Sequence, residues 1–186
     1  WSTKTETASR VRGRIESILD WATVQNYRKG ENPARWRGHL DKLLPKPSKV
    51  QKIKHHAAMP YEEIGVFMPK LQERDGIAAR GLEFLILTAT RTSEMLGAKW
   101  IEFDLNENIW TIPAERMKSD NEIRVPLSPV AAGIIQSMKE VSQSDYVFPG
   151  ARSRRPLSDM ACLNLLKRMD FKNITVHGFR STFRDW

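Results

Sequence analysis

Residues 76–90, with the sequence GIAARGLEFLILTAT, are apolar on almost every side when they are arranged as a helix. A helix of this kind is stable only where neighbouring elements cover it all round. The run therefore predicts a buried central helix in a domain that supplies other helices to pack against it. A short helix, TSEMLGA, is expected directly afterwards, and Arg91 lies between the two.

The segments on either side of this run predict one further helix and a small sheet. Apolar residues recur at helical spacing after Pro60, but Pro69 falls inside the pattern and should kink the helix or end it early. Three strand-like segments follow at 101–105, 108–113 and 122–127, which predicts an antiparallel meander. The apolar positions of the helix are Ile64, Phe67, Met68 and Leu71.

The rest of the chain predicts three more helices. Ser128-Pro129 is expected to start one, Ser158 to cap a second, and Thr175 to introduce the last, VHGFRSTFRDW. The apolar face of the second carries Met160, Leu163, Leu166 and Met169. The fold class predicted from these patterns is α+β, mainly α, with one three-stranded antiparallel sheet.

The first third of the chain has a different character. One helical pattern is closed by Gly30, and a second is expected to open at Asn32-Pro33. Two helices make a poor core, so residues 1–44 are interpreted as the C-terminal end of a helical domain whose earlier helices are absent from the chain. Residues 45–57 are predicted to be a basic linker, and 58–186 a second domain. The first pattern comprises Val11, Ile15, Ile18, Leu19 and Ala22, and the second carries Leu40, Leu43 and Leu44.

The charge of the chain is concentrated in two places. Residues 1–57 hold 13 basic and 5 acidic side chains, whereas 58–186 hold 17 of each, and within the latter an acidic stretch at 58–145 precedes a basic one at 146–186. Solvated charges that keep the protein in solution would be one explanation, but their clustering favours a bound phosphate backbone. The candidate DNA-binding residues are Arg10, Arg12, Arg14, Lys46, Lys49, Lys52 and Lys54.

Composition excludes several classes of protein. With 40% apolar residues the chain is not intrinsically disordered, and its single cysteine excludes an internal disulfide framework and fits a reducing compartment. It has no apolar run of the roughly 18 residues needed to cross a bilayer, no signal-peptide core and no initiator Met, so we expect a cytoplasmic segment of a longer protein. It also lacks a Gly-rich phosphate loop, an HExxH motif and a tight acidic cluster, so neither a metal nor another cofactor is expected.

Any catalysis must then use side chains, and four are candidates. Arg91 follows the apolar helix, Lys118 lies between the second and third strands, and His177 and Arg180 share a helical face at spacing i, i+3. Each also has an ordinary explanation. Arg91 could end a helix and pair with Glu94, Lys118 could be a solvated turn lysine, and His177 could simply start a helix.

Taken together, four segments are far more specific. ATRTSEML, RMKSDNEIRVPLS, DYVFPG with PLSDM, and TVHGFRSTFRDW resemble, in that order, the motifs of the tyrosine recombinase superfamily, in particular integrases of phages, prophages and genomic islands. TASRVRGRIESILDWA and NPARWRGHLDKLLP resemble the end of that group's core-binding domain. The resemblance implies that 58–186 is a catalytic domain with Arg91, Lys118, His177 and Arg180 as catalytic residues and Glu94 in a supporting position.

The chemistry of these residue types suits the reaction that the resemblance implies. Displacing one oxygen of a DNA phosphodiester adds negative charge to the two non-bridging oxygens, and the guanidinium groups of Arg91 and Arg180 can each bind that charge bidentately. Lys118 can protonate the departing 5′-oxygen, and His177 can accept a proton or donate a hydrogen bond to the phosphate.

The resemblance also implies a tyrosine nucleophile some tens of residues beyond the HxxR motif, where this chain has already ended. Tyr27, Tyr61 and Tyr146 do not match that position. We therefore expect a fragment of a site-specific recombinase that is inactive alone and whose parent forms a 3′-phosphotyrosyl bond as a homotetramer on duplex DNA, in the nucleoid of a bacterial cell. The alternative is a DNA-binding integrase remnant that does not cut. An RNA-binding module is weaker, because no aromatic-rich RNP-like strand is present.

Overall fold

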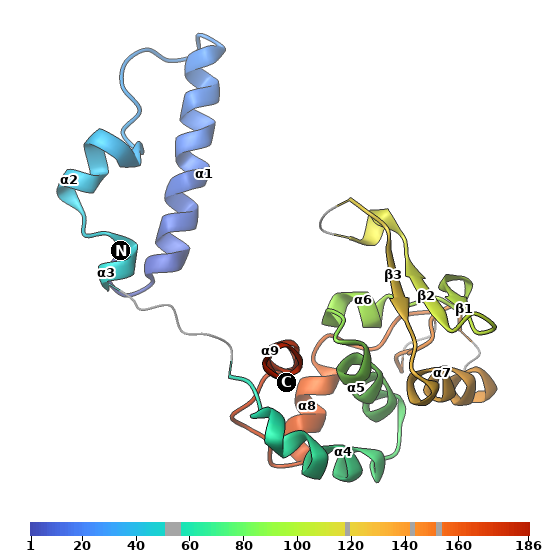
Figure 1. The fold of residues 1–186 in the computed structure, drawn as a ribbon. Helices are drawn as coiled ribbons and strands as arrows, with labels where there is room; N and C mark the ends of the chain where they lie inside the picture. Colours follow the sequence, from blue (N-terminus) through green and yellow to red (C-terminus); the bar gives the residue numbers. More distant parts are fainter. Residues whose placement is uncertain (51–56, 118–119, 142–143, 152–153) are drawn as a thin grey trace. The chain divides into compact units, whose positions relative to one another are not determined.

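The computed structural model describes residues 1–50, 57–117, 120–141, 144–151 and 154–186. The chain divides into two compact units, Trp1–His55 (unit 1) and His56–Trp186 (unit 2). Figure 1 shows the elements of each unit along the sequence.

Unit 1 is built on one long helix, α1 (Thr5–Val24). The predicted continuation to Gly30 is wrong, because Asn26 takes a left-handed conformation (φ 60°) and the backbone N–H of Tyr27 donates to the carbonyl of Ala22 (2.9 Å). This is the Schellman-type hydrogen bond that ends a helix. The remaining elements are η1 (Trp36–Leu40), a kinked turn, α2 (Asp41–Leu43) and α3 (Pro47–Val50).

Asn32 does not open a second helix as predicted, because its side chain is engaged with α1. It is 3% exposed, and its amide nitrogen donates to the backbone carbonyl of Glu16 (2.9 Å) and to Oδ1 of Asp20 (2.8 Å). The helical turn begins only at Trp36. Part of the predicted linker is also helical, since Pro47 begins α3, in agreement with the preference of proline for a first helical turn.

Unit 2 consists of helices around α5 and a small sheet. Its elements are η2 (Tyr61–Glu63), α4 (Ile64–Gln72), α5 (Ile77–Thr88), α6 (Thr92–Leu96), η3 (Trp100–Glu102), β1 (Phe103–Asp104), β2 (Ile109–Ile112), η4 (Ala114–Arg116), β3 (Ile123–Pro126), α7 (Pro129–Val141), α8 (Ala161–Arg168) and α9 (Gly178–Asp185). Among the described residues the chain is mainly helical, which confirms the predicted fold class.

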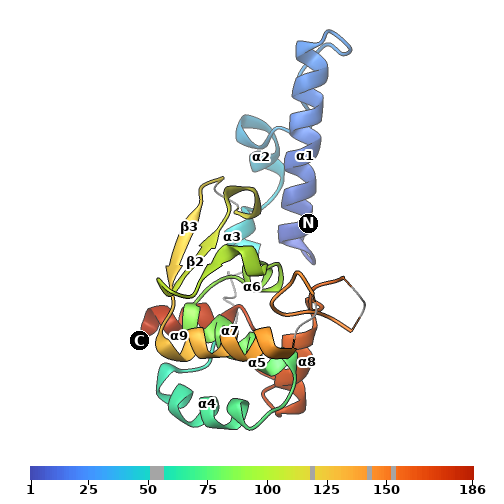
Figure 2. The same cartoon turned by 90° about the vertical axis from the view of Figure 1, so that its right-hand side faces the viewer.

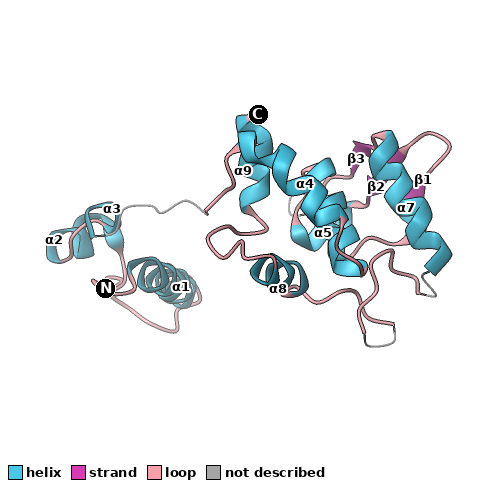
Figure 3. Cartoon of the chain, turned by 90° about the horizontal axis from the view of Figure 1, so that it is seen from below, coloured by secondary structure: helices cyan, strands magenta, loops and turns pink. Residues whose placement is uncertain are grey.

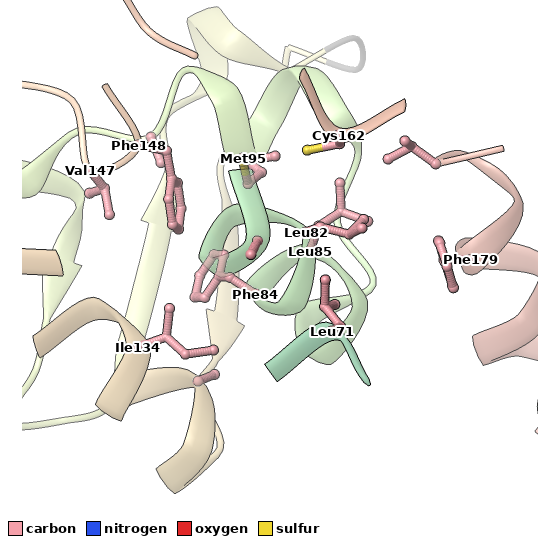
Figure 4. Packing of buried hydrophobic residues seen from close by; sticks show 14 of the residues in the cluster. Leu71, Leu82, Phe84, Leu85, Met95, Ile134, Val147, Phe148, Cys162 and Phe179 are labelled. Carbon is pink, nitrogen blue, oxygen red and sulfur yellow. The ribbon is translucent and has the colours of Figure 1, made fainter. Parts of the chain in front are cut away.

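The predicted central helix is confirmed. α5 contacts α4, α6, α7, α8 and α9, and it lies between α9 and α7 (Figures 1 and 3). The sheet lies above α5 and α4 lies below it in Figure 2. Leu82, Phe84 and Leu85 are at most 1% exposed and form the middle of the core (Figure 4). Glu83, the one acidic residue of this helix, is buried beside Arg80 (2.7 Å).

The predicted antiparallel sheet is confirmed as well. In the described part of the chain it has the order β1-β2-β3, with Phe103 opposite Trp110 and Thr111 opposite Arg124. Trp110 is completely buried, and its ring stacks on Phe103 at 5.3 Å between centroids. The sheet is thereby attached to the same core as α5, because Phe84 contacts both rings.

Two local predictions were wrong. Pro69 does not end α4 early, because the helix continues to Gln72 and Phe67 and Leu71 on either side of the proline are buried in the core. The helix expected from Ser158 begins at Ala161, and Met160 is 44% exposed. The Ser158 hydroxyl instead accepts a bond from the N–H of Met160 (3.3 Å) in the preceding turn.

Candidate active site

The candidate site is built on the turn that follows α5. Ala89 adopts a left-handed conformation (φ 50°, ψ 26°), which ends the helix at Thr88. The hydroxyls of Thr88 and Thr90 lie 3.0 Å apart, and Thr88 also donates to the carbonyl of Phe84 (2.8 Å). These bonds fix a tight turn, from which Arg91 continues into α6.

Arg91 and Glu94 form a closed pair at the start of α6. The backbone N–H of Arg91 donates to Oε2 of Glu94 (2.7 Å), and Nη1 of Arg91 donates to Oε1 (2.5 Å). The Glu94 side chain is 6% exposed, whereas that of Arg91 is 44% exposed. The buried carboxylate therefore holds the arginine in place, while part of the Arg91 side chain stays exposed to solvent.

Arg180, near the C-terminal end of the chain, bonds to the same turn. It lies on α9, is partly buried, and donates from Nη1 to the backbone carbonyl of Ala89 (2.5 Å). Because Ala89 precedes Arg91 by two residues, this bond attaches Arg180 to the turn that leads to Arg91, although 89 positions separate the two arginines in the sequence. Sequence patterns give no signal for the acceptor, since it is a main-chain oxygen.

His177 lies at the N-terminal end of α9 and is exposed. The helix start is fixed by Thr175, whose hydroxyl accepts a bond from the N–H of Gly178 (3.0 Å). A hollow of about 660 Å³ is lined by Ala89, His177, Arg180, Ser181, Phe183 and Arg184. The structure thus brings His177 and Arg180 together at this hollow. Arg91 does not line it, but Ala89, two residues earlier in the chain, does.

Lys118 lies outside the described residues. The residues that precede it in the β2–β3 connection are firmly held, because Met117 is 5% exposed and the Arg116 guanidinium bonds to the carboxylate of Glu102 and to the backbone carbonyl of Glu94. Glu102 also accepts a bond from the indole N–H of Trp110 (2.9 Å). This network, which ties the sheet to α6, was not predicted from the sequence.

The candidate DNA-binding residues of unit 1 differ in their surroundings. Arg10 and Arg14 line a shallow hollow on α1, and Arg10 pairs with Glu6 at the surface. Arg12 is held inside the unit, where Nη1 donates to the carbonyl of Ala34 (2.7 Å) and the guanidinium lies over the ring of Trp36. Lys46 and Lys49 are exposed, and Lys52 and Lys54 lie outside the described residues.

Two other kinds of site are absent from the described residues, and the single cysteine is buried. No group of three or more His, Cys, Asp or Glu side chains that could hold a metal ion occurs in the ranges that the structure describes. No described helix is long and apolar enough to span a membrane. Burial raises the pKa of the Cys162 thiol to about 11, so this residue is a poor nucleophile at neutral pH.

Two family models match the chain. The model of the phage integrase family matches residues 57–186, and that of the phage integrase central domain matches residues 1–39. The chain belongs to the phage integrase family. The resemblance to integrases of the tyrosine recombinase superfamily is thereby confirmed.

Two relatives extend over nearly the whole chain. The prophage integrase IntZ of Escherichia coli strain K12 is 35% identical over 184 residues, which cover 97% of this chain and 44% of that protein. The integrase of Enterobacteria phage P4 is 29% identical over 203 residues, which cover 98% of this chain and 44% of that protein. The chain therefore spans less than half the length of these relatives.

Solved structures share the fold at low sequence identity. The Tn1549 transposon integrase in complex with transposon right end DNA superposes with a TM-score of 0.73 at 13% identity, covering 96% of this chain and 65% of that one. A lambda integrase tetramer bound to a Holliday junction gives a TM-score of 0.67 at 16% identity, covering 97% and 53%. The arrangement of helices and sheet in this integrase is thus one already seen in other integrases.

Proposed function

We propose that this chain is part of a site-specific DNA recombinase that integrates or excises a mobile element by breaking and rejoining DNA strands through a 3′-phosphotyrosyl intermediate. The observation that carries the proposal is the bond from Arg180 to the carbonyl of Ala89, because it places a second guanidinium at the turn that presents Arg91. Family membership supports the same reaction.

Arg91 and Arg180 bind the scissile phosphate in this mechanism. Arg91 donates one N–H to Glu94, and Arg180 donates one to the carbonyl of Ala89. The other N–H groups of each guanidinium can then donate to the non-bridging oxygens. Donors that are already oriented need no reorganisation when negative charge develops on the phosphate, and this is the main source of catalysis at such sites. A protein cation takes the place of a metal ion in this scheme.

Proton transfer falls to the other two residues. His177, exposed at the rim of the hollow, accepts the proton of the attacking tyrosine or holds a phosphate oxygen. Lys118, from the β2–β3 connection, gives a proton to the departing 5′-oxygen. The 5′-hydroxyl released in this way later attacks the phosphotyrosyl bond, so rejoining needs no external energy source.

The proposed partner is the duplex DNA of attachment sites. Exposed cations of unit 1, including Arg14, Lys46 and Lys49, would contact phosphates, which position the protein without reading bases. The solved lambda integrase described above is a tetramer on a Holliday junction. By analogy we propose a homotetramer on DNA for the full-length recombinase.

None of the tyrosines in this chain is proposed as the nucleophile. Tyr27 is 75% exposed in unit 1, Tyr61 is 44% exposed on η2, and the ring of Tyr146 is covered by the Lys99 ammonium at 5.8 Å. The hollow between His177 and Arg180 is lined by none of them. The 186-residue chain should therefore bind DNA without becoming covalently attached to it.

The test compares Arg180→Ala with Arg168→Ala in the full-length recombinase on a suicide substrate. Loss of the Arg180 contact should cost about 3–4 kcal/mol, or several hundredfold in cleavage rate, whereas DNA affinity should change little because many phosphate contacts remain. Arg168 is exposed on α8 and does not line the hollow, so its loss should leave cleavage intact. Cleavage should also persist in excess EDTA.

Lys118→Ala separates proton donation from phosphate binding. A substrate with a 5′-bridging sulfur needs no proton on its leaving group, so it should restore much of the rate to Lys118→Ala but not to Arg180→Ala. Failure of both variants on that substrate would exclude Lys118 as the general acid. A covalent DNA adduct formed by the 186-residue chain itself would show that one of its own tyrosines is the nucleophile.

A further inference from the structure

The first described residues of unit 2 lie against the helix that carries His177 and Arg180. The carbonyl of Ala57 accepts bonds from the backbone N–H of Thr175 (3.0 Å) and from its hydroxyl (3.3 Å). One turn into α9, the hydroxyl of Thr182 donates to the carbonyl of Met59 (2.6 Å). Thr182 and Met59 are both 3% exposed, so this second bond is shielded from water.

Gly178 shows how close this approach is. A Cβ atom at this position would stand 2.3 Å from the carbonyl oxygen of Ala57 and 2.9 Å from the Cα of Ala58. Both are backbone atoms, which cannot turn aside as a flexible side chain would. The segment 57–59 therefore reaches α9 only because residue 178 has no side chain.

The contacts divide α9 into two faces with separate tasks. Gly178 and Thr182, at spacing i, i+4, face the segment 57–59, while His177 and Arg180, at spacing i, i+3, line the hollow. α9 has only eight residues, and a helix of this length depends on tertiary contacts for its position. Its rotation about its own axis decides where the Arg180 guanidinium lies.

We propose that the segment 57–59 positions α9 for catalysis, with Thr182 and Gly178 as its positioning residues. The segment contacts α9 at Gly178 and Thr182, one turn apart. These contacts fix the rotation of the helix so that Arg180, on another face, reaches the carbonyl of Ala89 and the phosphate. The role rests on the proposed function, because it acts through Arg180. Neither positioning residue lines the hollow.

The test uses the full-length recombinase and measures single-turnover cleavage together with DNA affinity. Thr182→Val keeps the shape of the side chain and removes the donor to Met59, so cleavage should fall about tenfold while the dissociation constant for DNA stays within about twofold. Gly178→Ala should lower cleavage at least as much. Thr182→Ser keeps the hydroxyl and should restore most of the rate.

A matched control is Ser137→Ala, which removes a hydroxyl that bonds to the carbonyl of Ile134 within α7. It should cleave at the wild-type rate. In an Arg180→Ala background, Thr182→Val should cause little further loss, since its effect passes through the missing side chain. Full additivity of the two losses would overturn the positioning role and leave only a general effect on stability.

The outcomes separate this inference from the function on which it rests. Wild-type cleavage by Arg180→Ala would overturn the proposed function and the positioning role with it. A strong defect in Arg180→Ala beside wild-type rates in Thr182→Val and Gly178→Ala would overturn the positioning role alone. If thermal unfolding shows that Thr182→Val does not fold, Gly178→Ala takes its place. Its cleavage rate is then compared with that of the Arg180→Ala, Gly178→Ala double variant.

Discussion

The two units are held together in different ways. Unit 2 has a continuous apolar core that extends from Met59 to Phe179, with Leu82 and Trp110 fully buried. The described residues of unit 1 bury little apolar surface, and α1 leaves Ile18 and Trp21 63% and 57% exposed. Polar contacts join α1 to the residues that follow it. The Asn32 amide bonds to Glu16 on α1, and Arg12 on α1 bonds to the carbonyl of Ala34.

This difference bears on what each unit can do. A site that stabilises a transition state needs donors held within a fraction of an ångström, and such precision comes from side chains supported by a packed core. The turn at Ala89 and α9 both have that support. Phosphate contacts along DNA need less precision, because each contributes through charge and many act together. The DNA contacts proposed for unit 1 are of this second kind.

The largest effect that would test this contrast is the truncation of one apolar side chain in each unit. Leu82→Ala should destabilise unit 2 by about 2–5 kcal/mol, because Leu82 is fully buried and leaves a cavity. Ile18→Ala in α1 should change stability by about 0.5 kcal/mol or less, since the side chain is largely exposed. Urea unfolding followed by circular dichroism measures both. Equal losses would mean that the apolar face of α1 is covered in solution.

The fold of unit 2 follows from its sequence more closely than that of unit 1. The run around Leu82 is apolar on all sides, so only a buried helix fits it. The end of α1 depends instead on the left-handed conformation of Asn26, and the role of Asn32 on a bond to Glu16, 16 residues earlier. The spacing of apolar residues records neither. The prediction that Pro69 ends α4 is wrong for a different reason, because burial of Leu71 outweighs the hydrogen bond that proline cannot make.

The candidate site shows the same limit. Motif spacing singles out Arg91, His177 and Arg180, but the acceptor that holds Arg180 is the backbone carbonyl of Ala89. The segment 57–59, which packs against α9, lies more than 110 residues away from that helix in the sequence. Charge alone also gave Arg12 and Arg14 the same predicted role in DNA binding. The structure distinguishes them, because Arg12 is bonded inside unit 1.

The pH dependence of stability provides a second test of the core of unit 2. The Cys162 thiol has its pKa raised from 9.0 to about 11 by burial, so between these values the unfolded chain loses a proton that the folded chain keeps. Stability should then fall as pH rises, by about 2 kcal/mol between pH 8 and 10.5. Cys162→Ala should lack this part of the loss, because all other groups are the same in the two proteins. Parallel pH profiles for the two proteins would contradict the burial of the thiol.

A smaller effect is expected from the polar contacts of unit 1. Arg12→Ala removes the bond to the carbonyl of Ala34, the ion pair with Glu16 and the contact with Trp36, so unit 1 should lose about 1–3 kcal/mol. Arg10→Ala removes only a solvent-exposed pair with Glu6 and should cost about 0.5 kcal/mol or less. Thermal unfolding monitored by tryptophan fluorescence separates the two. If both variants were equally stable, unit 1 would not depend on its internal polar bonds.

The smallest effect concerns backbone strain at the turn of the candidate site. Ala89 has φ 50°. An L residue in this left-handed region destabilises the folded state by about 1 kcal/mol or more, whereas glycine adopts it without strain. Ala89→Gly relieves that strain but makes the unfolded chain more flexible, so the net gain in unfolding free energy should be about 0.5–1 kcal/mol. In unit 1, Asn26 has φ 60°, and because asparagine tolerates this conformation, Asn26→Gly should gain nearly nothing. Chemical unfolding of both variants measures the difference. A loss of stability in Ala89→Gly would mean that the methyl group of Ala89 packs usefully in the turn that presents its carbonyl to Arg180.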